Sequence, residues 1–127
     1  MAVLIDTSLL IEFERNPGAV PDAQDFAISV ISVSELLHGV ERAEGAVRTR
    51  RSAFIEQLVA SFPVLDVTTA VARAHAQIWA ALEVRGERIG AHDLWIAATA
   101  VTHGFELATR NTAEFGRIPG LRLLDVR

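Results

Sequence analysis

The chain alternates short apolar runs with longer segments in which hydrophobic residues recur every three or four positions. Short runs of aliphatic and β-branched residues are typical of strands that are buried on both faces of a sheet. The first of these runs, MAVLID, opens the chain and ends in Asp6. We expect four further strands, in FAISVIS (26–32), FPVLDVT (62–68), FELAT (105–109) and LRLLDV (121–126).

Five segments with helical spacing lie between these runs. In TSLLIEFER the residues Leu9, Leu10 and Phe13 share one face, and NPG at 16–18 ends the helix. The other segments are SVSELLHGVERAEG (32–45), about 46–61, TTAVARAHAQIWAALEVRG (68–86), and an apolar helix from about 92 to 103 that Gly104 ends. The alternation of strands and helices predicts an α/β fold, with a mostly parallel sheet covered on both faces, in one domain over residues 1–127.

The composition removes several classes of function. The 127 residues include no cysteine, which excludes disulfides, zinc sites built on Cys and Cys nucleophiles. The apolar runs are far shorter than the roughly 18–20 residues of a membrane span, and no signal peptide with a basic start is visible. We therefore expect a soluble, cytoplasmic protein. Its net charge of −4 argues mildly against a general nucleic-acid coat.

Polar side chains follow several of the predicted strands. Asp6 closes the first strand, Glu35 lies just inside the helix after the second, and Asp93 begins the apolar helix. Thr109 and Asn111 follow FELAT. Ligands of open α/β sheets bind outside the carboxyl ends of the strands, so these oxygen-bearing side chains are expected at one edge of the sheet.

Clustered carboxylates repel one another unless a cation lies between them. Oxygen ligands without Cys or a suitably spaced His pair favour a hard divalent ion, Mg²⁺ or Mn²⁺. The reaction that such a site implies is metal-assisted hydrolysis of a phosphodiester.

Each of these side chains also has a purely structural interpretation. Asp6 and Asn111 precede helical segments and would then be N-caps. Glu35 fits a capping box, SVSE, in which Ser32 is the N-cap, and Asp93 would accept backbone N–H bonds in the first helical turn. Their joint position after successive strands favours the functional interpretation.

The histidines and tryptophans carry less information. His38, His75, His92 and His103 share no spacing typical of metal ligands, and only His92 is adjacent to a candidate, Asp93. Trp79 and Trp95 lie in helical apolar patterns, so we expect them in the core or in an interface.

Four segments of the chain resemble the PIN-domain family, and in particular the VapC-type toxins of toxin–antitoxin pairs. These are VLIDTSLLIE at the start, ISVSELLHGV around Glu35, GAHDLWIAATA around Asp93, and LATRNTAEFGRIPGLRLLD at the end. They occur in the family's order and cover nearly the whole chain. The resemblance implies a PIN-like α/β/α sandwich with four or five strands and an endoribonuclease that depends on Mg²⁺ or Mn²⁺. It also implies an RNA substrate, inhibition by a VapB-like antitoxin, and a homodimer.

The resemblance also assigns the site, position by position. Asp6, Glu35 and Asp93 match the three acidic residues of the family's metal site. Asn111 takes a fourth position that is often Asp, which puts a second metal in doubt, because Asn is neutral. Glu114 is an alternative for that position that we do not favour. Thr109 resembles the family's hydroxyl residue near the metal-bound water.

Arginine is the only source of positive side-chain charge apart from His, since none of the twelve basic residues is Lys. A genome-wide base bias would explain the absence of Lys, whereas the RTRR cluster is a weak pointer to phosphate. We expect a positive rim drawn from Arg48, Arg50, Arg51, Arg85, Arg88 and Arg110.

Two other functions stay open from the sequence. One is a PIN nuclease of RNA processing, and the other is a non-catalytic RNA- or protein-binding module that retains the fold. A phospho-receiver domain also places acidic residues at strand ends, but this chain has no Lys and no acidic pair beside its first strand.

Overall fold

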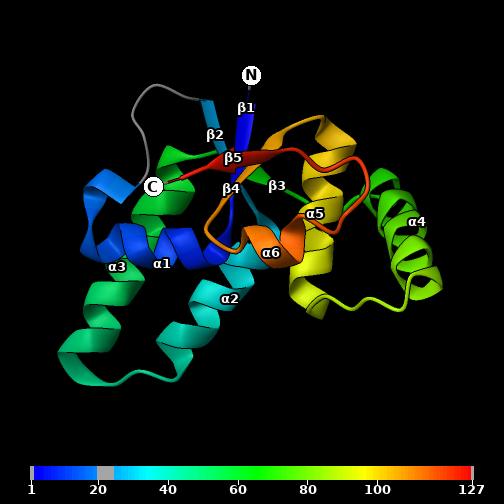
Figure 1. Cartoon of the computed structure of the whole chain (residues 1–127). Coiled ribbons are helices and arrows are strands. Elements are labelled where there is room, and N and C mark those ends of the chain that lie inside the picture. The colour runs from blue at the N-terminus through cyan, green and yellow to red at the C-terminus, as the bar shows by residue number, and fades with distance from the viewer. Residues whose placement is uncertain (1, 20–24, 127) are drawn as a thin grey trace.

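The computed structural model describes residues 2–19 and 25–126, which include a sheet of five parallel strands (Figure 1). The strands lie in the order β3-β2-β1-β4-β5. Their bounds are Ala2–Ile5 for β1, Asp25–Ser29 for β2, Val64–Leu65 for β3, Glu106–Thr109 for β4 and Leu123–Asp125 for β5. The predicted α/β fold with a parallel sheet is therefore confirmed.

Helices cover both faces of this sheet (Figure 1). Their bounds are Thr7–Arg15 for α1, Val30–Glu41 for α2, Gly45–Ser61 for α3, Thr69–Val84 for α4, Ala91–His103 for α5 and Thr112–Phe115 for α6, with a 3₁₀ turn, η1, at Pro17–Ala19. Connections between parallel strands must cross from one end of the sheet to the other, and helices make most of these crossings here. The arrangement is an α/β/α sandwich.

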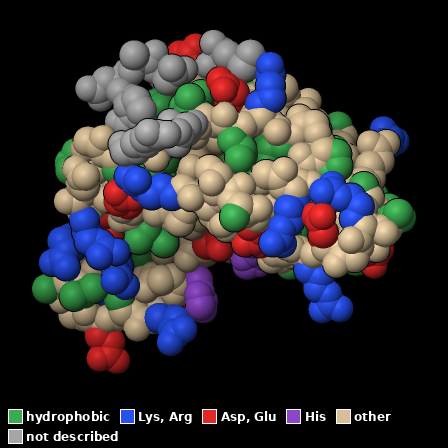
Figure 2. Space-filling view, in the orientation of Figure 1, with side chains coloured by type: hydrophobic (Ala, Val, Ile, Leu, Met, Phe, Trp, Pro, Cys, Tyr) green, Lys and Arg blue, Asp and Glu red, His purple; other side chains and the backbone are tan. Residues whose placement is uncertain are grey.

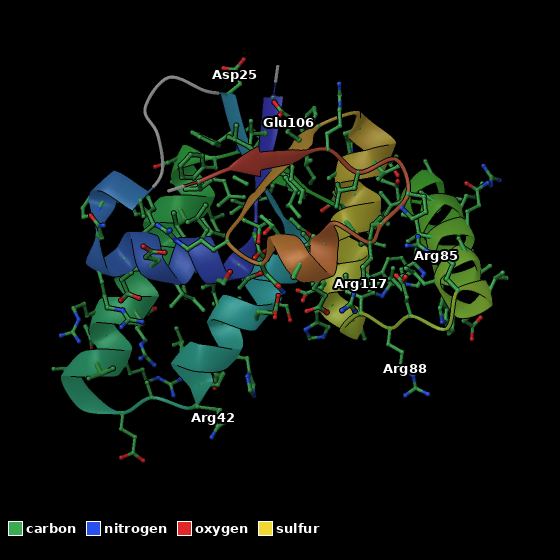
Figure 3. The ribbon with its side chains drawn as sticks, viewed as in Figure 1. Asp25, Arg42, Arg85, Arg88, Glu106 and Arg117 are labelled. Atoms are coloured by element: carbon green, nitrogen blue, oxygen red, sulfur yellow. The ribbon has the colours of Figure 1, made fainter. Side chains whose placement is uncertain are left out.

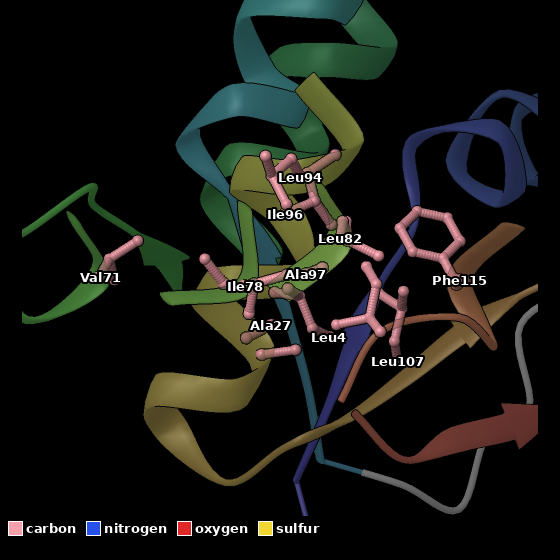
Figure 4. Close-up of a cluster of buried hydrophobic side chains, with 13 residues drawn as sticks. Leu4, Ala27, Val71, Ile78, Leu82, Leu94, Ile96, Ala97, Leu107 and Phe115 are labelled. Atoms are coloured by element: carbon pink, nitrogen blue, oxygen red, sulfur yellow. The ribbon is translucent and has the colours of Figure 1, made fainter. Parts of the chain in front are cut away.

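The two halves of the core follow from the alternation of side chains along β1. Leu4 packs on one face with α4 and α5, in a cluster that includes Ile78 and Ile96 (Figure 4). Val3 and Ile5 point to the other face, where residues of α1 and α3 cover them. Because β1 is buried on both faces, it carries no polar side chain until it ends at Asp6.

Two strands are shorter than the apolar runs predict. The run at 26–32 is a strand only as far as Ser29, whose hydroxyl accepts a hydrogen bond from the Ile31 N–H at 3.1 Å and begins α2. The predicted N-cap at Ser32 is therefore wrong, since helical structure begins two residues earlier, at Val30. At 62–68, only Val64–Leu65 pair with β2.

The end of the apolar helix agrees with the sequence. Gly104 is the C-cap of α5 and has a φ of 68°, a left-handed conformation that favours glycine. Trp79, in contrast, is 55% exposed on α4 and lies outside the core. Trp95 is half-buried and stacks on the His75 ring, with 3.6 Å between the ring centroids. Among the helices of the described residues, none has the length and apolar character needed to cross a membrane.

Candidate active site

The candidate site lies at the carboxyl ends of β1, the central strand of the sheet, and of its neighbour β4. The chain continues from β1 into α1 and from β4 into α6, while β2 leads into α2 beside them. The strand order reverses direction between β1 and β4, which is where open parallel sheets form a ligand crevice. Asp25 and Glu106 lie at the opposite edge, where β2 and β4 begin (Figure 3).

Asp6 is held in this crevice by two hydroxyl groups. Its side chain is 3% exposed, and Oδ2 accepts hydrogen bonds from Ser8 Oγ at 2.7 Å and Thr109 Oγ1 at 2.8 Å. Asp6 is the N-cap residue of α1 by backbone position, but its side chain makes no capping bond. The interpretation of this carboxylate as a helix cap is therefore wrong: it is oriented toward β4 by a residue 103 positions away.

Glu35 is oriented by α1 and lies beside His92. Thr7 Oγ1 donates to Glu35 Oε1 at 2.8 Å, and Glu35 Oε2 lies 3.5 Å from His92 Nδ1. Ser32 Oγ lies 2.7 Å from Thr7 Oγ1, and because the single Thr7 hydroxyl proton goes to Glu35, Ser32 is the donor in this contact. The capping-box interpretation of Glu35 is wrong, since the side chain makes no bond back to the start of α2.

Of the four carboxylates at the site, Asp93 is the one without a hydrogen-bond donor among the described groups, whereas Asp6, Glu35 and Glu114 each have at least one. It is half-buried in the first turn of α5, whose N-cap, Gly90, makes no side-chain bond. Burial raises the pKa of Asp93 to about 6, and repulsion from Asp6, Glu114 and Glu35 adds to that rise. Three other segments of the chain therefore bring negative charge around the Asp93 side chain.

Glu114, in α6, belongs to this group of carboxylates. Its Oε1 accepts from the Gly90 N–H at 2.9 Å, and its Oε2 accepts from Asn111 Nδ2 at 2.9 Å. These two bonds lower the pKa of Glu114 and connect α6 to the start of α5. The sequence shows a carboxylate, Glu114, in the segment NTAEF. Neither periodicity nor spacing, however, indicates that α6 turns this side chain toward Asp93.

Thr109 and Asn111 have different places in the site. Thr109 is fully buried and, besides donating to Asp6, accepts from the Asn111 N–H at 3.0 Å. Asn111 is exposed and its side-chain amide contacts Glu114. It is the N-cap of α6 by position, again without a side-chain capping bond.

The donor set around Asp93 consists of carboxylate oxygens, which are the ligands that hard divalent cations prefer. Within residues 2–19 and 25–126, no group of three or more His, Asp or Glu side chains is already close enough to hold a metal ion. Hydrogen bonds to hydroxyl, amide or backbone groups hold Asp6, Glu35 and Glu114 in their separate positions. The chemistry of the set fits a divalent cation, because a positive charge would relieve the repulsion that raises the Asp93 pKa.

Comparison with known proteins identifies the family of the chain. The PIN domain family model matches residues 3–121. Ribonuclease VapC1 of Rickettsia felis is 38% identical over 130 aligned residues, which cover 99% of this chain and 97% of the relative. The tRNA(fMet)-specific endonuclease VapC of Shigella flexneri is 34% identical, with 96% of each chain covered.

A solved structure shares both the fold and the extent of the chain. The crystal structure of VapBC-5 from Mycobacterium tuberculosis, a member of the VapBC family of toxin–antitoxin systems, aligns with a TM-score of 0.79 and 29% identity, covering 99% of this chain and 98% of that one. The family match, the identity to named ribonucleases and this structural likeness all span nearly the full chain. The chain therefore belongs to the PIN-domain family and, within it, to the VapC ribonucleases.

Proposed function

We propose that this protein is a metal-dependent endoribonuclease that hydrolyses RNA phosphodiester bonds at the crevice between β1 and β4. The observation that carries the proposal is Asp93, a half-buried carboxylate without a described hydrogen-bond donor, whose pKa is raised by burial and by repulsion from Asp6, Glu114 and Glu35. A folded protein retains such repulsion where a bound cation compensates for it, and the relatives named above are ribonucleases.

Asp6, Glu35 and Asp93 are the residues that we assign to a bound Mg²⁺ or Mn²⁺. When bound, such a cation supplies an acidified water and stabilises negative charge on the phosphate oxygens. Ser8 and Thr109 orient Asp6, and Thr7 orients Glu35, so hydroxyl groups fix two of the three carboxylates. His92 lies beside Glu35 and is exposed to the solvent from which substrate arrives.

The proposal predicts that cleavage requires a divalent cation. Purified protein, freed of any partner, would be incubated with total cellular RNA in Mg²⁺, in Mn²⁺ or in EDTA. We expect discrete fragments with either metal and none in EDTA, and the fragment ends would identify the target. Equal cleavage in EDTA would contradict the metal dependence. The absence of cleavage by folded, metal-loaded protein would favour a binding module.

Glu114 provides a prediction about the fourth position of the site. Glu114→Gln removes a negative charge near Asp93 while retaining the size of the side chain, so we expect weaker Mn²⁺ binding and activity lower by roughly 10- to 100-fold. Asn111→Ala is the matched comparison, because the Asn111 amide contacts Glu114 and its effect is expected to be smaller. Calorimetric titration with Mn²⁺ and initial rates measure both. A larger loss in Asn111→Ala would give the fourth position to Asn111.

We also propose that a VapB-like antitoxin inhibits the enzyme. The support is the structural likeness to VapBC-5, and the carboxylate group around Asp93 would attract a basic antitoxin side chain in place of the metal's charge. Inhibition by the protein encoded beside this gene, relieved in excess Mg²⁺, is the expected result. Full activity in a stable complex with that protein would exclude inhibition.

A cytoplasmic homodimer completes the proposal. Large apolar side chains are exposed on α4, with Trp79 at 55% and Val84 at 89% exposure, and surfaces of this kind are typical of interfaces between subunits. Sedimentation equilibrium should give twice the mass of one chain. A monomer at micromolar concentration would contradict the dimer.

A further inference from the structure

A cleft of about 550 Å³ opens beside the active site, between α1, α2 and α3. Glu35 lines it, so the cleft is continuous with the carboxylates described above. Arg15, Arg50 and Arg51 also line it, around the apolar side chains of Leu36 and Phe54. The three arginines come from two helices, α1 and α3, that face each other across the cleft.

These arginines differ from those that other contacts already hold. Arg110 donates to both carboxylate oxygens of Glu12, at 2.6 and 2.9 Å, and Arg85 donates to Glu87 at 3.0 Å and to the Arg117 carbonyl at 2.8 Å. Arg48 lies 3.4 Å from Glu41. The expected rim of six arginines therefore contains three whose guanidinium groups are engaged within the protein.

Arg50 and Arg51 are exposed, and no described carboxylate pairs with either. Figure 2 shows basic side chains gathered on the part of the surface that α3 occupies in Figure 1. An arginine without an internal partner keeps its planar fork available for a phosphate, to which it donates two parallel hydrogen bonds. Glu14 is the other acidic residue lining the cleft, so the arginines outnumber it once Glu35 is assigned to the cation.

We propose that this cleft binds the RNA backbone next to the scissile bond, with Arg50 and Arg51 contacting phosphates and Arg15 supporting them from α1. The inference rests on the proposed function and extends it, because it assigns the substrate path to one side of the acidic crevice. Leu36 and Phe54 form an apolar floor for the arginine stems, which keeps their charged ends at the surface. The acidic crevice repels RNA, whereas this cleft supplies the attraction that holds it nearby.

The test measures RNA binding separately from cleavage. Fluorescein-labelled bulk tRNA is titrated with Asp93→Asn protein in Mg²⁺, at several salt concentrations, and compared with the same protein carrying Arg50→Gln and Arg51→Gln. We expect the dissociation constant to increase by about tenfold or more, and the slope of log affinity against log salt to become shallower by about 1.4 to 1.8, for two lost phosphate contacts.

The matched control carries Arg42→Gln and Arg48→Gln, which remove the same charge from the C-cap of α2 and from the first turn of α3. Arg42 follows the end of α2 and points away from the protein (Figure 3), and neither residue lines the cleft. We expect the control to bind tRNA nearly as well as its parent. Equal losses in the two doubly substituted proteins, or an unchanged salt slope after loss of Arg50 and Arg51, would overturn the inference.

Three further outcomes separate this inference from neighbouring ones. If the loss of Arg50 and Arg51 leaves tRNA binding intact and abolishes binding of the antitoxin, the cleft is a protein-docking surface and the inference fails. If tRNA binding falls as expected but wild-type protein cleaves no RNA, the phosphate contacts stand and the proposed hydrolysis fails. If cleavage by the otherwise wild-type Arg50→Gln/Arg51→Gln protein is as fast as before at limiting RNA, hydrolysis stands and the inference fails.

Discussion

Asp93→Asn is expected to abolish RNA cleavage while leaving the protein as stable as before, or more stable. The substitution removes the carboxylate on which the repulsion from Asp6, Glu35 and Glu114 converges, but it retains the shape of the side chain. Loss of a residue that we assign directly to the cation should cost at least about 100-fold in activity, since even the residues that orient such ligands are typically worth 10- to 100-fold.

The stability side of this prediction follows from the sign of the pKa change. The pKa of Asp93 is about 6 in the folded protein, against an ordinary value of 3.8, so folding disfavours the ionised form. The stabilising contribution of the Asp93 side chain is fully present below pH 3.8, where the side chain is protonated, and is lost as the pH rises toward 6. At neutral pH, Asn at this position should therefore raise the free energy of unfolding. We expect a gain of only about 1 kcal/mol, because solvent screens the repulsion on a half-exposed carboxylate.

Thermal unfolding in EDTA at pH 4 and pH 7.5 measures this effect alongside initial rates of cleavage. We expect the melting temperature of Asp93→Asn to exceed that of the wild type at pH 7.5 and to match it more closely at pH 4. A variant that loses both activity and melting temperature would show that Asp93 supports the fold, and the assignment to the cation would then fail.

Thr109→Val should be the most destabilising of the substitutions proposed for the site. The change keeps the β-branched shape that suits β4, but it removes the donor to Asp6 Oδ2 and the acceptor of the Asn111 N–H. Leaving buried polar groups without partners costs about 1–3 kcal/mol. Because Asp6 also loses one of the two hydroxyls that orient it, we expect activity to fall roughly 10- to 100-fold.

Thr99→Val is the control for this substitution. Thr99 is also fully buried, but its hydroxyl donates at 2.8 Å to the Trp95 carbonyl, one turn earlier in α5. That carbonyl keeps its helical partner, so we expect little change in stability and none in activity. Urea unfolding and cleavage rates for both variants test the pair. Similar behaviour of the two would mean that the Thr109 hydroxyl has no particular role in orienting Asp6.

The sequence predicted the order of elements well because each one depends on local patterns. Buried parallel strands are short apolar runs, and Gly104 marks a helix end through its own backbone preference. The end of β2 was misjudged because Ile31 is as apolar as a strand residue, while the structure is decided by the Ser29 hydroxyl that caps α2. Apolar character alone does not distinguish these two continuations.

The sequence predicted the main acidic residues of the site, but it did not predict the contacts that Glu114 and Arg110 make. Asp6, Glu35 and Asp93 follow strands or begin helices, so their common edge could be inferred from the fold class. The interaction of Glu114 with Asp93 and Gly90 depends on how the short helix α6 is oriented, which only tertiary packing sets. In the same way, the engagement of Arg110 with Glu12 joins residues 98 positions apart and leaves no local signal.

The hydroxyl contact between Thr7 and Ser32 should restrict which substitutions evolution accepts at these two positions. Ser32 donates to Thr7, and Thr7 donates to Glu35, so the direction of both hydrogen bonds is fixed by the carboxylate that accepts the last one. Thr7→Val alone would leave both the Ser32 hydroxyl and Glu35 Oε1 without this partner, whereas Thr7→Val combined with Ser32→Ala would leave only Glu35 Oε1 without one. Positions 7 and 32 should therefore covary among relatives, and a change at position 7 should persist more readily where position 32 has already lost its hydroxyl.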